Sequence, residues 1–272
     1  MKVVAVINQK GGVGKTTTAV NLGAALSRLG KAVLLLDMDP QANLSLHLDK
    51  RPELEAKTIT HLLVDGTPLE DLVQATNVER LCVVPADTSL NGVEQVLANR
   101  IGRETILREA LEVWPGVRNF DWILIDCPPA LGVLAANALV AADEVLIPVQ
   151  PEYFALQGMA KLMEVISLVQ RRLNPRLKTK AILPCLVDTR TKLTQEVLGE
   201  IRAHFPGLLA RAMIRVNVKL AEAPSFGKTI FEHAPDSNGA SDYLAFALEF
   251  SGAAANSTSI ASTPASDAAG AS

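Results

Sequence analysis

A glycine-rich octapeptide between an apolar run and a helical pattern constrains the fold of this chain more than any other feature. The octapeptide, Lys10–Thr17, reads KGGVGKTT and follows the apolar residues Val3–Ile7. Residues Thr16–Leu29 place small and aliphatic side chains at helical spacing. A buried strand, a glycine-rich turn and a helix are the context that a phosphate-binding loop requires. We therefore predict that this segment binds the phosphates of a nucleotide.

Each residue type in the octapeptide has a role in phosphate binding. Glycines let backbone N–H groups approach phosphate oxygens, and the start of the helix adds free donors and partial positive charge. Lys15 is suited to neutralise the terminal phosphates, and the Thr16 hydroxyl is suited to bind Mg²⁺. The nucleotide-binding residues predicted in the loop are Lys10, Gly11, Gly12, Val13, Gly14, Lys15, Thr16 and Thr17.

Two more apolar runs end in carboxylates, at Lys31–Asp37 and at Phe120–Asp126. In an open α/β sheet the carboxyl ends of parallel strands share one edge, so these acids should face the phosphate loop. Asp126 is predicted to hold Mg²⁺ through water. Asp39, just after the first of these runs, is the candidate for orienting the attacking water and a possible metal ligand. Asp37 has two open interpretations, a functional acid or a structural one that caps a helix or pairs with a lysine.

These motifs together resemble a known family. The lysine-fronted loop, the strand ends LLDMDPQ and IDCPP, and the segment IPVQPEYFAL at residues 147–156 are similar to those of ParA/Soj-type partition ATPases. That family belongs to the MinD/ParA group of deviant Walker A P-loop proteins. The later segments DTRT at 188–191 and VKLAEAPSFGK at 218–228 extend the resemblance to about residue 250.

The resemblance implies site residues beyond the phosphate loop. Lys10 would contact the ATP of a partner subunit, and Lys10, Lys15 and Asp39 would be catalytic. Arg215 and Asn217 would lie beside the adenine, although the family carries proline where this chain has Arg215. Residues implied to bind DNA are Arg190, Lys192, Arg215, Lys219 and Lys228.

The resemblance also implies a working cycle. ATP with Mg²⁺ would join two subunits, the homodimer would bind double-stranded DNA without sequence preference, and hydrolysis, stimulated by a ParB-type centromere-binding protein, would reset the dimer. The protein would then be cytoplasmic and associated with the nucleoid. An alternative from another class is a ParA-like ATPase that positions a protein cargo instead of a DNA locus. Capture of a cargo adaptor in place of a centromere binder would favour that alternative.

Charge along the chain is uneven, although the net charge is −3. Residues 180–232 carry eight Lys/Arg and five Asp/Glu and form the one basic block when the chain is divided at residues 180 and 232. That block contains the DNA-binding residues implied by the resemblance. The three cysteines show neither metal-ligand spacing nor a disulfide framework. No apolar run reaches the roughly 18 residues that span a bilayer, so no membrane partner is expected.

Strand and helix patterns alternate along the chain and predict a single α/β domain over residues 1–250. The sheet should be doubly wound and mainly parallel, with helices on both faces. Further helices are predicted at 58–63, 69–73, 93–111 (broken near Gly102), 133–142, 156–173, 195–205 and 240–250. Further strands are predicted at 81–85 and 181–187, and another is predicted to end at Val149. Residues 251–272, rich in Ala and Ser without periodicity, are predicted to be a disordered tail that lacks the basic amphipathic helix of MinD-type proteins.

Overall fold

A seven-stranded sheet forms the centre of the molecule in the computed structural model, which describes residues 1–50 and 56–253. The strand order is β3-β4-β2-β5-β1-β6-β7, and only β3 runs antiparallel to its neighbour within the described residues. The strands are β1 (Lys2–Val6), β2 (Val33–Asp37), β3 (Gln74–Ala75), β4 (Leu81–Val84), β5 (Trp122–Asp126), β6 (Glu144–Val149) and β7 (Lys178–Pro184). The predicted doubly wound, mainly parallel sheet is confirmed.

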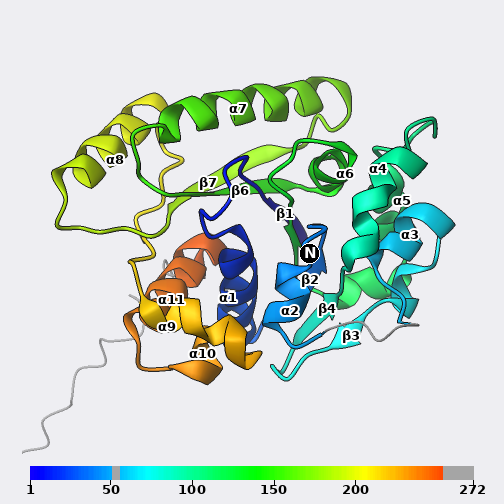
Figure 1. The fold of residues 1–272 in the computed structure, drawn as a ribbon, viewed down its shortest axis with the longest axis horizontal. Helices are drawn as coiled ribbons and strands as arrows, with labels where there is room; N and C mark the ends of the chain where they lie inside the picture. Colours follow the sequence, from blue (N-terminus) through cyan, green and yellow to red (C-terminus); the bar gives the residue numbers. More distant parts are fainter. Residues whose placement is uncertain (51–55, 254–272) are drawn as a thin grey trace, which may run out of the picture.

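Helices cover both faces of this sheet, and Figure 1 shows α1 and α11 on one side and α6 and α7 on the other. The helices are α1 (Lys15–Arg28), α2 (Asn43–His47), α3 (Ile59–Asp65), α4 (Val93–Val96), α5 (Ile106–Val113), α6 (Val133–Ala141), α7 (Ala155–Arg172), α8 (Lys192–His204), α9 (Val218–Glu222), α10 (Ile230–His233) and α11 (Asn238–Ser251). Short 3-10 turns lie at Leu69–Asp71, Thr88–Gly92, Pro115–Asn119 and Ala223–Phe226.

Alternate residues of the central strands feed two separate cores. In β1, Val3 and Ala5 pack with side chains from α3 to α8, whereas Val4 and Val6 pack with α1, α9, α10 and α11. Both faces are covered, so β2 and β5 are buried at every position. This explains why the sequence shows continuous apolar runs instead of an alternating pattern.

Several predicted elements differ from the structure. The helix predicted over 93–111 is broken into two short helices, α4 and α5, as expected near Gly102, which has φ of 74°, but the gap between them is longer than predicted. The helix predicted at 69–73 is a single 3-10 turn that leads into β3, and the strand predicted at 181–187 begins earlier, at Lys178. The tail predicted from residue 251 loses its first residue to α11, which ends at Ser251, and residues 254–272 lie outside the described part.

Both edges of the sheet are occupied by short pieces of chain. The two-residue strand β3 pairs with β4 at one edge. At the other edge, β7 and the residues after it form isolated bridges with Leu209 and Arg215, and Ala210 N–H donates to Ile182 O at 2.9 Å. Neither edge of the described sheet therefore exposes a long row of free backbone groups.

Candidate functional site

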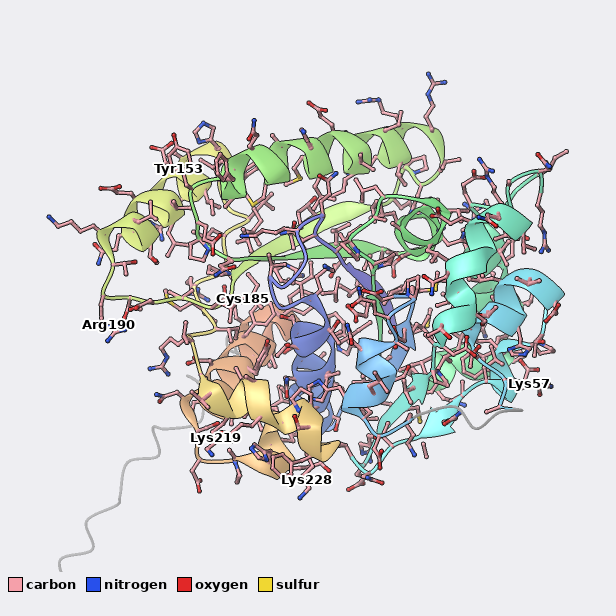
Figure 2. All side chains as sticks on the ribbon, viewed as in Figure 1. Lys57, Tyr153, Cys185, Arg190, Lys219 and Lys228 are labelled. Carbon is pink, nitrogen blue, oxygen red and sulfur yellow. The ribbon has the colours of Figure 1, made fainter. Side chains whose placement is uncertain are left out.

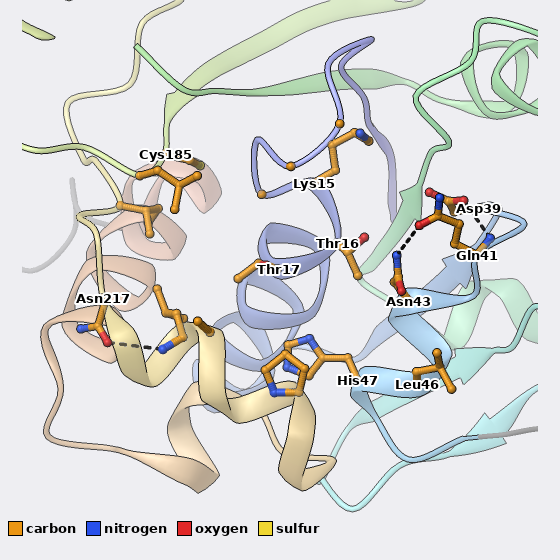
Figure 3. A pocket seen from close by; sticks show the side chains of 18 of the residues that line it. Lys15, Thr16, Thr17, Asp39, Gln41, Asn43, Leu46, His47, Cys185 and Asn217 are labelled. Carbon is orange, nitrogen blue, oxygen red and sulfur yellow. Dashed lines mark hydrogen bonds between the residues drawn. The ribbon is translucent and has the colours of Figure 1, made fainter. Parts of the chain in front are cut away.

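A cavity of about 600 Å³ opens at the carboxyl edge of the sheet, where β1, β2 and β5 end (Figure 3). The phosphate loop and α2 line part of it, and the segment from Ile214 to Ser225 lines much of the rest. Nine of the predicted site residues line this cavity: Gly11, Gly12, Gly14, Lys15, Thr16, Thr17, Asp39, Arg215 and Asn217.

The phosphate loop takes its shape from glycines. Gly12 and Gly14 have φ of 74° and 92°, a left-handed region that favours glycine. The α1 helix begins at once, with Thr18 N–H donating to Gly14 O at 2.8 Å, and its first turn contains no acidic side chain. The loop therefore presents free N–H groups and the positive end of a helix to the cavity. Val13 is predicted to wrap the phosphates, but its side chain is buried behind the loop.

Lys15 is the buried cation of the cavity. Its Nζ donates to Lys10 O at 3.2 Å, and only 7% of the residue is exposed. Burial lowers the pKa of Lys15, while the neighbouring carboxylates of Asp126 and Asp39 raise it. A bound triphosphate would add negative charge at this position and so stabilise the ammonium form.

Thr16 and Asp126 form the best candidate for a Mg²⁺ site. The Thr16 hydroxyl donates to Asp126 Oδ2 at 2.7 Å. The other oxygen, Asp126 Oδ1, is buried and has no hydrogen-bond partner in the described chain. Burial and the nearby Asp37 raise the pKa of Asp126 well above its ordinary value. A carboxylate oxygen without a partner beside a hydroxyl fits an oxygen-ligated Mg²⁺ whose remaining ligands are water and phosphate. No group of three or more His, Cys, Asp or Glu side chains able to hold a metal occurs in the described residues, so protein carboxylates alone would not form the site.

The structure separates the two acids after β2. Asp37 is fully buried, and it accepts hydrogen bonds from Ser45 N at 2.9 Å and Ser45 Oγ at 2.6 Å. It therefore anchors α2, which is the structural interpretation, and burial raises its pKa to about 6. Asp39 lines the cavity; its Oδ1 accepts from Gln41 N at 2.9 Å, and its Oδ2 has no hydrogen-bond partner in the described part of the chain.

The side chain of Lys10 points away from the cavity residues of the loop. Its ammonium group forms an ion pair with Glu152, and both side chains are about half exposed. The backbone of Lys10 is held by Asn8, whose Oδ1 accepts from Lys10 N at 3.0 Å and whose Nδ2 donates to Pro148 O at 2.8 Å. Lys10 is thus presented at the surface next to the loop between β6 and α7.

Arg215, which lines the cavity and is partly exposed, pairs with a buried acid. Arg215 donates to both oxygens of Asp242 on α11, through Nη2 to Oδ1 at 2.6 Å and Nε to Oδ2 at 3.0 Å. Asn217 caps α9, because its Oδ1 accepts from Lys219 N at 2.9 Å. The guanidinium of Arg215 is therefore engaged within the fold, where the sequence resemblance implied adenine and DNA contacts.

The residues implied to bind DNA differ in how free their charges are. Figure 2 shows Arg190, Lys219 and Lys228 along one side of the molecule, from the loop before α8 to the loop before α10. The guanidinium of Arg190 forms two hydrogen bonds with Asp188, and Lys219 pairs with Glu222 at 2.8 Å. Within the described residues, Lys192 and Lys228 have no carboxylate within 4.0 Å.

Sequence reasoning missed one wall of the cavity. The short helix α2 and its approach contribute Gln41, Asn43, Leu46 and His47. His47 Nε2 lies 3.0 Å from Lys228 O, a geometry in which the ring N–H donates to the carbonyl. Burial lowers the pKa of His47 to about 4. A helix of five residues shows too little periodicity to be found in the sequence, so only the acidic DMD signal before it pointed to this region.

Comparison with known proteins places the chain in a family. The AAA domain family matches residues 1–179. The sporulation initiation inhibitor protein Soj of Bacillus subtilis is 46% identical over 248 residues, which cover 91% of this chain and 97% of the relative. The chromosome-partitioning ATPase Soj of Thermus thermophilus is 48% identical over 246 residues, covering 90% and 94%.

Solved structures agree with this family at the level of the fold. Cobyrinic acid a,c-diamide synthase of Mycobacterium smegmatis, with bound ADP and magnesium, matches with a TM-score of 0.80 and 36% identity, over 94% of this chain and 96% of that one. The cell division ATPase MinD of Pyrococcus furiosus matches with a TM-score of 0.74 and 26% identity, over 93% and 99%. With its phosphate loop, its strand-end acids and relatives that match along nearly their whole length, the chain belongs to the ParA/Soj family of chromosome-partitioning P-loop ATPases.

Proposed function

We propose that the protein is an ATP-dependent switch for DNA partition, on a chromosome or a plasmid. In this proposal MgATP occupies the cavity and joins two copies of the chain. The homodimer binds double-stranded DNA without sequence preference, and hydrolysis, stimulated by a ParB-type partner, releases it. The protein would act in the cytoplasm on the nucleoid. Within the described residues, no helix has the length and apolarity needed to cross a membrane.

The observation that carries the nucleotide part of the proposal is the unpartnered oxygen of Asp126 beside Thr16 and the buried Lys15. When bound there, Mg²⁺ would offset negative charge on the phosphate oxygens. Lys15 would leave the Lys10 carbonyl and pair with the terminal phosphates. The free N–H groups of Gly11 to Thr16 would donate to the phosphate oxygens.

Asp39 is the residue we assign to the attacking water. Asp39 lines the cavity, and because Gln41 N donates to its Oδ1, its Oδ2 is left without a partner in the described residues. Oδ2 can then accept a hydrogen bond from a water and orient its lone pair toward the terminal phosphate. The fold supplies no arginine at the phosphate end of the described cavity, since Arg215 is bound to Asp242. Slow hydrolysis by the protein alone is expected on this basis.

Lys10 is available to act in a second copy of the chain. Its backbone is fixed by Asn8, but its side chain is exposed and paired with the equally exposed Glu152. Breaking such an exposed ion pair costs about 0–1 kcal/mol, which contact with a partner's phosphates would offset. In this geometry the side chain of Lys10 does not line the cavity of its own chain.

A second candidate is an ATPase that positions a protein cargo. It is favoured because three of the predicted DNA-binding side chains, Arg190, Lys219 and Arg215, each pair with a carboxylate that offsets their positive charge. The resident acids would reduce the attraction of these cations for phosphate.

The two candidates differ in one experiment. Binding of mixed-sequence duplex DNA would be measured with ATP, with ADP and without nucleotide, over a series of salt concentrations. The partition switch requires binding only with ATP, with a steep fall as salt rises. If the protein bound ATP and dimerised but bound no DNA at low salt, the cargo function would replace it. A variant with Arg190→Ala and Lys219→Ala should bind ATP normally and show a shallower salt dependence on DNA.

A further inference from the structure

A cluster of cations without acidic partners lies where α7 ends and β7 begins. Residues 165–187 contain five Lys/Arg and no Asp/Glu. Only Lys180 of these five has a carboxylate within 4.0 Å among the described residues, namely Glu144, which also pairs with Lys2. The net charge of residues 1–179 is negative, so this cluster does not appear in the net charge of that long segment.

The four remaining cations are exposed on a compact turn. Arg171 and Arg172 end α7, and Arg176 and Lys178 follow within six residues. The turn is closed by Gln170, whose Nε2 donates to Leu177 O at 2.8 Å. The four side chains therefore project from one short turn, which the hydrogen bond between Gln170 and Leu177 closes.

The same turn is fixed to its surroundings by a buried asparagine. Asn174 Nδ2 lies within hydrogen-bond distance of Leu139 O and Ala142 O at the end of α6, at 3.0 and 2.7 Å. From α5, Arg108 Nη1 donates to Leu173 O at 3.3 Å, which adds a fifth cation beside the turn. We call Arg108, Arg171, Arg172, Arg176 and Lys178 the basic corner. Its backbone is held in place before any ligand arrives, so binding has to order only the side chains.

Helix-end electrostatics explain only part of the basic corner. Arg171 and Arg172 lie in the last turn of α7, where cations are favoured by the helix dipole. Arg176 and Lys178 lie beyond the helix and gain nothing from it. Four of the five cations are arginines, whose planar groups match phosphate oxygens bidentately and are weakly hydrated. This composition suits a phosphate backbone.

We propose that the basic corner binds the phosphate backbone of duplex DNA as a second contact of each subunit. The inference rests on the proposed function, in which the ATP-bound protein binds DNA. Because α7 has 18 residues, the basic corner lies about 27 Å along the helix from the loop that holds Glu152. The corner is thus separate from the cavity and from Arg190, Lys219 and Lys228, which lie on the side that carries α9 and the loops before α8 and α10 (Figure 2).

The test compares two variants of equal charge change in the full chain. The corner variant carries Arg171→Gln and Arg176→Gln. The control variant carries Lys161→Gln and Arg202→Gln, two exposed cations on α7 and α8 outside the basic corner. Fluorescence anisotropy with a short mixed-sequence duplex would be measured with Mg²⁺ and a slowly hydrolysed ATP analogue, in roughly 50–200 mM salt. Thermal unfolding and ATP binding confirm that both variants remain folded.

The corner variant should bind DNA about tenfold more weakly than the control. Its slope of log affinity against log salt should be less steep by about 2, because each of the two lost phosphate contacts contributes about 0.9. Equal affinity and slope in the two variants, with the wild type bound to DNA, would overturn the basic corner and leave the proposed function intact. No DNA binding by the wild type would overturn both. If the corner variant lost binding to polyglutamate while its DNA binding was unchanged, the basic corner would be assigned to an acidic protein partner and the proposal would be refuted.

Discussion

Replacement of His47 by glutamine tests how α2 is packed. His47 is only 2% exposed, and burial lowers its pKa from 6.5 to about 4. The folded state therefore keeps the ring neutral while the unfolded state takes up a proton below pH 6.5. Stability is lost as pH falls from about 6.5 toward 4, and the loss stops below the folded pKa. The difference between pKa values of 6.5 and about 4 corresponds to about 3.4 kcal/mol in full, of which about 2.5 kcal/mol is lost by pH 4.5.

Glutamine can donate its amide N–H to Lys228 O but does not titrate. Urea unfolding of the wild type and His47→Gln from pH 7.5 to 4.5 isolates the contribution of the histidine to stability. The contribution of Asp37 has the opposite sign, but it is present in both proteins and cancels in their difference. Burial raises the pKa of Asp37 from 3.8 to about 6, so that carboxyl gains stability as pH falls through this window. The free-energy advantage of the wild type over the variant should shrink by about 2.5 kcal/mol between the two pH values.

The exposed His204 on α8 provides the matched control, as His204→Gln. A difference between wild type and His47→Gln that stays constant within about 0.5 kcal/mol across the pH range would show that His47 is not buried as a neutral ring. The packing of α2 against the loop before α10 would then have to be revised.

Four further single substitutions and one double variant address the cavity. Lys15→Ala should abolish nucleotide binding in a fluorescent-ATP assay, whereas Asp39→Ala should bind ATP and lose phosphate release; normal hydrolysis by Asp39→Ala would contradict the role given to that acid. Asp126→Asn removes a carboxylate whose pKa is raised by burial, so melting without ligand should occur at a higher temperature, while the extra stabilisation by MgATP over ATP should vanish. Arg215→Met leaves the buried Asp242 without its cation and should cost about 2 kcal/mol in urea unfolding; Arg215→Met paired with Asp242→Asn should recover part of that loss, and no recovery would argue against this pairing.

The sequence predicted those features whose physics is local. The phosphate loop needs only glycines, a lysine and the start of a helix, and buried parallel strands need only short apolar runs, so both were predicted within a few residues. The acids after these strands share one edge because parallel topology requires it. The role of Asp37 stayed open in the sequence, since its partner Ser45 is brought near by the turn into α2.

Contacts between residues far apart in the sequence could not be predicted. The pairing of Arg215 with Asp242 joins residues 27 positions apart, and Glu152 meets Lys10 across 142 positions. Neither pair leaves a periodic signal. The break between α4 and α5 was placed correctly at Gly102 but its extent was underestimated, because Leu97 ends the first helix and the second begins only at Ile106.

The covered edges of the sheet bear on how the protein behaves when crowded. In the proposed function the protein would gather on DNA and meet other copies of itself at high local concentration, where open strand edges pair between copies. Here β3 occupies one edge with two residues, and the segment from Leu208 to Arg215 occupies the other through its bridges to β7 and Val187. Self-association is thereby directed away from irreversible strand pairing, which leaves surfaces such as the one around Lys10 for contacts that can be undone.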